Sequence, residues 1–205
     1  MARIPLWLKI AVTAWAAVYV PAYLKQYGAL PFLWFCNLGN LMLVAGLWLE
    51  SALLVSMVAL SVLLVQTLWT VDVLGRLLLG VHPIGGTEYM WDAKIPLWIR
   101  LISLFHVAIP VLLVFLLRRL GYDRRALVAQ TLLCWIVLTV CYFFTPPALD
   151  LNWVFGLKGK PQTWGWPGGL YLLATMAGYV VLLYLPAHLL LGSRMAGMRP
   201  TARTS

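Results

Sequence analysis

Residues 52–74 read ALLVSMVALSVLLVQTLWTVDVL, an apolar run in which Asp72 is the one charged residue. A bilayer core about 30 Å thick is crossed by about 20 apolar residues in a helix that rises 1.5 Å per residue. The run is long enough for one crossing, and its polar residues are too sparse to form the polar face of a surface helix. It therefore predicts a membrane-spanning helix, and the fold depends on how many such runs the chain contains.

The whole chain shares the composition of that run. Its 205 residues are 63% hydrophobic and 10% charged, and the mean hydropathy is +0.90. Ordinary globular chains are about 45–50% apolar and about 25% charged. This composition excludes a water-soluble enzyme, a disordered chain and a disulfide-stapled secreted domain.

Six apolar runs of about the right length follow one another, separated by Gly, Pro and charged residues. We expect spanning helices near residues 4–24, 30–49, 52–74, 96–117, 126–144 and 166–191. Two longer segments, 75–95 and 145–165, are then loops on the same side of the membrane. The sequence thus predicts an all-α polytopic transmembrane bundle that forms a single integral membrane domain over residues 1–205.

The basic residues predict the orientation of this bundle. The chain has 15 Lys and Arg against 6 Asp and Glu, and four of the arginines fall in the short loop RRLGYDRR at residues 118–125. Clusters of this kind mark the cytoplasmic side of a membrane protein. We therefore expect both termini to be cytoplasmic, in a cell inner or plasma membrane. The positive charge indicates membrane lipids as partners and not nucleic acid.

The few polar residues inside these runs gather toward the outer side. At 1.5 Å per residue, Cys36 lies about 9 Å below the start of its run and His106 about 15 Å below the start of its own. The same placement puts six residues in the outer half of the bundle: Cys36, Asn37, Asn40, Asp72, His106 and Asn152. A thiol, an imidazole and several amides at one depth are the parts of a nucleophilic acyl-transfer site.

Each of these residues also has a purely structural interpretation. A buried Cys packs as a small apolar side chain, and an intramembrane His often bonds a neighbouring helix. Metal and haem sites are not indicated, because the chain lacks His-x-x-x-His and Cys-x-x-Cys spacings and places His106 and His188 at different depths. We expect neither a metal ion nor another cofactor.

The order of these features resembles the YwaF-like integral membrane proteins and their eukaryotic membrane acyltransferase relatives. LPFLWFCNL at residues 30–38 is similar to that family's Leu-Pro-Leu-x-Leu-Cys stretch, which sets Cys36 on the family cysteine. LWTVD at residues 68–72 is similar to the family's Leu-Thr-Pro-Asp, although Val71 replaces the proline. His106 matches an in-helix histidine, and Asn152 lies in a loop similar to the family's Asn-containing loop. For some relatives the resemblance, which covers about residues 30–190, implies acyl transfer on lipids.

The combined hypothesis is a lipid-directed acyltransferase or hydrolase that works near the outer leaflet. In it Cys36 is the nucleophile, His106 is the general base, and Asp72 orients the imidazole. Substrate-binding roles are expected for four further residues, of which the asparagines hydrogen-bond the developing oxyanion: Trp34, Asn37, Asn40 and Asn152.

The sequence leaves open whether the protein is an enzyme at all. The alternative is a non-catalytic membrane protein, either an accessory subunit or a carrier. A carrier is suggested by an internal similarity, because RIPLWLKI at residues 3–10 recurs as KIPLWIRL at residues 94–101. Three spans separate the two copies, as in an inverted repeat. Both copies also have the pattern of an ordinary interfacial helix start, with Pro in the first turn beside Trp and a basic residue.

Overall fold

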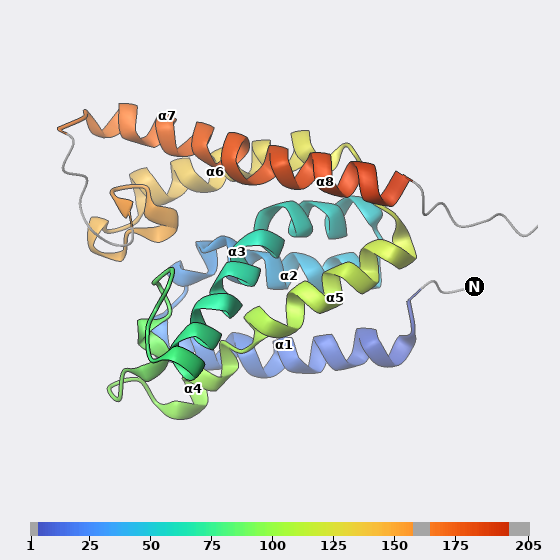
Figure 1. The fold of residues 1–205 in the computed structure, drawn as a ribbon, viewed down its shortest axis with the longest axis horizontal. Helices are drawn as coiled ribbons and strands as arrows, with labels where there is room; N and C mark the ends of the chain where they lie inside the picture. The colour runs from blue at the N-terminus through green and yellow to red at the C-terminus, as the bar shows by residue number, and fades with distance from the viewer. Residues whose placement is uncertain (1–3, 158–164, 197–205) are drawn as a thin grey trace, which may run out of the picture.

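In the computed structural model, which describes residues 4–157 and 165–196, all the regular structure is helical (Figure 1). The α-helices are α1 (Leu6–Tyr27), α2 (Phe35–Trp48), α3 (Ala52–Leu79), α4 (Leu97–Ile102), α5 (Phe105–Leu120), α6 (Ala126–Phe144), α7 (Gly168–Gly178) and α8 (Leu185–Ala196). Short 3-10 turns are η1 (Leu30–Leu33), η2 (Glu88–Trp91), η3 (Pro147–Leu149) and η4 (Leu151–Trp153), and a π-helical segment, η6 (Tyr179–Tyr184), joins α7 to α8.

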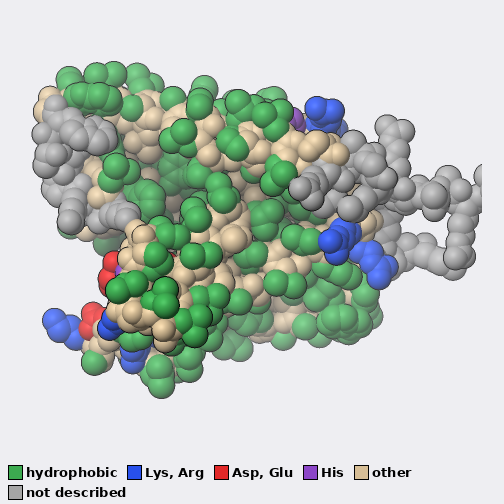
Figure 2. Space-filling model, viewed as in Figure 1, with side chains coloured by type: hydrophobic (Ala, Val, Ile, Leu, Met, Phe, Trp, Pro, Cys, Tyr) green, Lys and Arg blue, Asp and Glu red, His purple; other side chains and the backbone are tan. Residues whose placement is uncertain are grey.

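The predicted all-α membrane bundle is confirmed. Five helical stretches are long and apolar enough to cross a bilayer: Leu6–Tyr27, Ala52–Leu79, Leu97–Leu120, Ala126–Phe144 and Gly168–Ser193. The sixth predicted helix is shorter, since α2 has 14 residues and measures only about 21 Å at 1.5 Å per residue. On the face shown in Figure 2, hydrophobic side chains cover the length of the molecule and charged ones gather at its two ends. The chain is therefore an integral membrane protein.

Helix α3 is the axis of the bundle and contacts α2, α5, α6 and α8. Half of its most apolar stretch is buried inside the protein, a larger share than in the other long helices. This central position explains why its apolar residues occupy all sides instead of one stripe. Around it, α1 lies at one edge of the molecule, and the rod formed by α7, η6 and α8 lies at the other (Figure 1).

Small residues allow α2 to approach α3 closely. A Cβ atom on Gly39 would lie 3.3 Å from a Val62 methyl group, and one on Gly46 would lie 3.3 Å from Leu54 and Val55. Small residues at such crossings give transmembrane helices the close packing that holds them together in lipid.

The connection between α2 and α3 is held from two sides. Ser51 caps α3, because its hydroxyl accepts a hydrogen bond from the Leu54 N–H at 3.3 Å. Glu50 has the left-handed φ of 47°, and its carboxylate pairs with Lys9 of α1 at 2.8 Å. The ion pair therefore joins α1 to this tight turn.

Two predicted boundaries need correction at the end of the bundle that carries residues 80–96, which we call the loop end. The loop expected from residue 75 begins at Gly80, whose left-handed φ of 75° ends α3. Pro83 folds back onto Gly75 within this longer helix, where a Cβ atom would lie 2.6 Å from the Pro83 ring, so the close approach requires glycine.

The predicted helix 96–117 is divided at Ser103 and Leu104 into α4 and α5. Within α5, Pro110 has no N–H to donate to the His106 carbonyl. The Thr70 hydroxyl of α3 lies 3.4 Å from that carbonyl, but its single hydrogen has a nearer acceptor in the Gln66 carbonyl, at 2.8 Å. The proline therefore leaves the His106 carbonyl with only a long contact from the neighbouring helix. The two copies of the IPLW motif both begin helices, with Pro5 and Pro96 as the N-cap residues of α1 and α4.

The close approach of α2 and α3 gives a first prediction. We expect Gly46→Leu to lower the free energy of unfolding by about 1–3 kcal/mol, because the new side chain must displace Leu54 and Val55. The measurement is the thermal unfolding midpoint of the purified protein in detergent. Gly192→Leu is the matched control, since nothing lies within 4 Å of a Cβ atom there; equal loss in both variants would contradict the packing argument.

Candidate functional site

The residues predicted to form a site lie on elements at one end of the bundle, the loop end. Cys36 lies in the first turn of α2, Asp72 near the end of α3, and His106 in the first turn of α5. Asn152 lies in η4, and Trp34 is the N-cap residue of α2. The depth argument from the sequence thus selected residues from four separate elements that end at the same side of the bundle (Figure 1).

Cys36 and its neighbour Asn37 face the turn that precedes α2. The partly buried Cys36 thiol donates to the Asn37 Oδ1 at 3.7 Å. The Asn37 amide in turn donates from Nδ2 to the Pro31 carbonyl at 2.8 Å. Asn37 is therefore engaged in holding η1 against the start of α2.

Asn152 is a clamp between two distant parts of the chain. Its Nδ2 donates to the Leu33 carbonyl at 2.8 Å and approaches Cys141 Sγ at 3.5 Å, and its Oδ1 accepts from the Phe35 N–H at 3.1 Å. The residue is 1% exposed and holds a left-handed φ of 54°. Both ends of this amide are occupied by the protein, so Asn152 secures the start of α2 to the final loop.

Asn40 differs from the other two asparagines. Its side chain is 2% exposed, and neither Nδ2 nor Oδ1 has a hydrogen-bond partner among the residues that the structure describes. The buried Tyr19 hydroxyl is the polar group beside it, close enough to interact with the Asn40 side chain but without a well-formed hydrogen bond. Of the three asparagines predicted to donate to a substrate, Asn40 is the one whose amide is not bonded to a backbone carbonyl of the described residues.

His106 has a defined tautomer. Its Nδ1 lies 2.7 Å from the Ser103 carbonyl oxygen, and because a carbonyl only accepts hydrogen bonds, Nδ1 carries the hydrogen of the neutral ring. Nε2 is then an unprotonated acceptor. The ring stacks between Phe105, at a centroid distance of 4.0 Å, and Trp69, at 4.6 Å. No hydrogen bond joins His106 to Cys36 in the described ranges 4–157 and 165–196.

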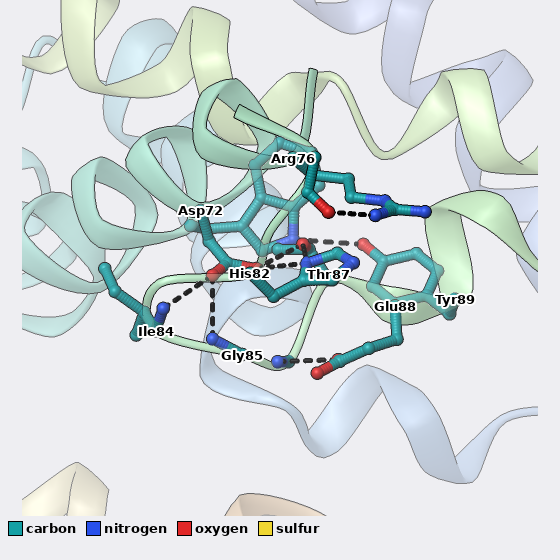
Figure 3. A network of polar contacts seen from close by, with 11 residues as sticks. Asp72, Arg76, His82, Ile84, Gly85, Thr87, Glu88 and Tyr89 are labelled. Atoms are coloured by element: carbon teal, nitrogen blue, oxygen red, sulfur yellow. Dashed lines mark hydrogen bonds and ion pairs between the residues drawn. The ribbon is translucent and has the colours of Figure 1, made fainter. Parts of the chain in front are cut away.

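Asp72 was expected to orient His106, and the structure corrects this. Its carboxylate is fully buried and binds the loop that follows α3 (Figure 3). Oδ1 accepts from the N–H groups of Ile84 and Gly85, each at 2.7 Å. Oδ2 lies 2.9 Å from His82 Nδ1 and accepts a short hydrogen bond from the Thr87 hydroxyl. Asp72 therefore orients His82, and four partners use up its acceptor capacity.

The sequence reasoning did not single out His82 and Thr87. Both lie in HPIGGT, residues 82–87, outside the apolar runs that predict spanning helices. The two adjacent glycines offer a signal, because Gly85 and Gly86 have left-handed φ values of 84° and 97° that turn the backbone N–H groups toward acidic side chains. His82 also meets the edge of Trp91, at a ring-centroid distance of 5.2 Å.

Two tyrosines link the loop end to the spanning helices. The Tyr23 hydroxyl of α1 and Ser103 Oγ lie 2.8 Å apart. Trp69 donates its indole N–H to the Tyr89 hydroxyl at 3.2 Å. Burial raises the pKa of Tyr89 to about 12, so this phenol stays neutral and able both to donate and to accept.

A groove of about 400 Å³ runs between α1, α2, α4 and α5. Its lining is apolar apart from Asn40 and includes Trp15, Leu43, Phe105 and Ile109. Two further lining residues, Leu101 and Leu104, are exposed on the hydrophobic flank of the bundle. The volume lies within the range of about 300–1,000 Å³ that is usual for ligand sites, and the opening faces the lipid.

Among residues 4–157 and 165–196, no three His, Cys, Asp or Glu side chains are grouped so that they could hold a metal ion. Comparisons of the chain with protein-family models, with curated proteins and with solved structures find no match.

The fourfold bonding of Asp72 gives a second prediction. We expect Asp72→Asn to lower the free energy of unfolding by about 1–3 kcal/mol. The Asn amide replaces one acceptor oxygen with an NH2 group, which then faces N–H or O–H donors of the loop. Residues 80–96 should also become more mobile. The measurement is the rate of trypsin cleavage after the exposed Lys94, which should increase. Glu88→Gln, which changes an exposed carboxylate that accepts one backbone hydrogen bond, is the control. Cleavage of Asp72→Asn at the wild-type rate would show that the loop does not depend on this carboxylate.

Proposed function

We propose that this protein acts on the acyl group of a membrane lipid, as an acyltransferase or a hydrolase. The observation that carries the proposal is the buried Asn40 amide, which has no partner in the described chain and lines an otherwise apolar groove. A polar group in hydrocarbon is costly without a hydrogen bond. An ester carbonyl at the end of an acyl chain offers the acceptor that Asn40 Nδ2 lacks.

In this proposal Cys36 attacks that carbonyl, although its side chain is not among those that line the groove. It lies four residues before Asn40 and therefore one turn away on the same face of α2. His106 follows Phe105, a lining residue of the groove, and its Nε2 is free to take a proton. Because a thiol is a weak nucleophile until it gives up its proton, the base and the thiol have to act together.

The reaction proposed for these groups has two steps. The Cys36 proton passes to His106 Nε2, the sulfur bonds to the ester carbonyl carbon, and the ester C–O bond breaks as the leaving alcohol takes the proton from His106. Water or an acceptor alcohol then attacks the thioester, with His106 again taking and returning a proton, and the thiol is restored. Asn40 donates to the carbonyl oxygen while it carries negative charge. Cys36 has to turn from Asn37 toward His106 for the first step.

The second candidate is a non-catalytic membrane protein. It is favoured by one observation, that Asn37 and Asn152 use their amide groups to bond backbone carbonyls. Asn37 bonds the turn just before α2, and Asn152 bonds a distant part of the chain. An accessory subunit uses its polar residues in this way. For a carrier, the same amides would only shape the fold, and the groove would hold the transported lipid.

We further propose that the protein lies in a cell inner membrane with both termini in the cytoplasm. The support is the distribution of charge. Arg118, Arg119, Arg124 and Arg125 surround the short α5–α6 connection, opposite the loop end. Basic residues next to helix ends favour the cytoplasmic side and anionic headgroups. The loop end then faces outward, which places the proposed chemistry near the outer leaflet.

A third prediction tests the chemical step. Wild-type protein in dodecyl maltoside, incubated with a phosphatidylcholine that carries an alkyne-tagged acyl chain, should acquire a tag that hydroxylamine removes, as expected of a thioester. Cys36→Ala should abolish this tag. His106→Gln should slow its appearance by about 100-fold or more, the usual contribution of a general base.

Cys134→Ala is the matched control, because Cys134 is a buried free cysteine that takes no part in the proposal. Its labelling should equal that of the wild type. A tag that persists in Cys36→Ala, or wild-type protein that never acquires one, would favour the non-catalytic alternative.

A further inference from the structure

Arg100 of α4 has an unusual environment near the loop end. Its Nη1 donates to the Met90 carbonyl in η2 at 2.9 Å, which holds the guanidinium in place. Its Nε is buried and has no hydrogen-bond partner in the part of the chain that the structure describes. No Asp or Glu forms an ion pair with Arg100 within the same ranges. A permanent positive charge is therefore fixed, partly buried and without a protein counter-ion.

An ordinary interfacial arginine behaves differently. Arg and Lys near the ends of transmembrane helices extend toward water and the headgroups, with their charged ends solvated. Lys94 near the same helix start is exposed in this way, whereas the Arg100 Nε is turned inward. Because an unpaired charge in a partly buried site is costly, the environment of Arg100 indicates an anionic ligand.

Arg100 is not itself a lining residue of the groove, but it lies on α4, the short helix that borders it. The two residues that follow it, Leu101 and Ile102, line the groove. Ser103, one turn further along, bonds Tyr23 of α1 and closes the space between α1 and α4. Arg100 thus belongs to a helix that borders the groove, and its bond to the Met90 carbonyl holds the guanidinium toward the loop end.

We propose that the ligand of the groove is a glycerophospholipid whose phosphate pairs with Arg100. This inference rests on the proposed function and names its substrate class. A planar guanidinium with several N–H donors is well suited to phosphate oxygens. A glycerophospholipid carries its acyl ester between the phosphate and the chain, so one molecule supplies the anion for Arg100 and the carbonyl for Asn40. A free fatty acid has no ester for Cys36, and a neutral glyceride has no anion for Arg100.

The test is photo-crosslinking of the full chain in dodecyl maltoside, a detergent without phosphate. Two probes are compared, phosphatidylglycerol and diacylglycerol, each with the same diazirine-bearing acyl chain. We expect Arg100→Gln to reduce crosslinking by the phospholipid about tenfold, the ratio that one charge-assisted hydrogen bond represents. Crosslinking by diacylglycerol should stay within about twofold of the wild type, which also shows that the variant is folded.

Lys94→Gln is the matched control for general attraction between charges. It should leave both probes within about twofold of the wild type. Equal losses in Lys94→Gln and Arg100→Gln, or no loss in Arg100→Gln, would overturn the proposal. Displacement of the phospholipid by millimolar inorganic phosphate would also overturn it, because the site would then select phosphate without a lipid. Acylation of Cys36 is measured in a separate assay. These outcomes would therefore overturn the phospholipid assignment without overturning the proposed function.

Discussion

A polar group in the hydrocarbon core of a bilayer has no water to bond, so it must find its partner within the protein. The contacts of this chain follow that constraint. Pro110 leaves the His106 carbonyl without its helical donor, and the Thr70 hydroxyl of the neighbouring helix approaches that carbonyl at 3.4 Å. The start of α2 is bonded by Asn152 from a distant loop. At the loop end, the Asp72 carboxylate is surrounded by four donors from a single connection (Figure 3).

The departures from this rule are what make a functional site recognisable. Asn40 and the Arg100 Nε are buried without partners in the described residues, and both belong to elements that border the same groove. Gln66 of α3 is also buried with an unpaired amide, but it does not line that groove. The ligand that we propose, which combines an anion, a carbonyl and an apolar chain, would satisfy the first two groups together. Such a ligand would distinguish a lipid-directed protein from a purely structural bundle.

The apolar runs predicted most of the fold, because a segment of about 20 apolar residues has few alternatives to spanning a membrane. The helix 126–144 was expected with the bounds that α6 has. The errors lie where tertiary contacts compete with local pattern. Pro83 packs on Gly75 and the helix continues to Leu79, whereas the predicted helix 96–117 breaks at Ser103. Neither the Pro83–Gly75 contact nor the break at Ser103 can be predicted from the hydropathy of the residues involved.

The sequence by itself determined that this is an all-helical membrane protein, because composition and run length depend only on how each residue partitions between water and lipid. It also determined that Cys36, Asn40 and His106 lie toward one end, since depth follows from the helical rise. Only the tertiary structure decided which of them are free to act. Hydrogen bonding depends on side-chain directions across helices, so Asp72 serves His82, Asn152 clamps the backbone, and Asn40 is left facing the groove.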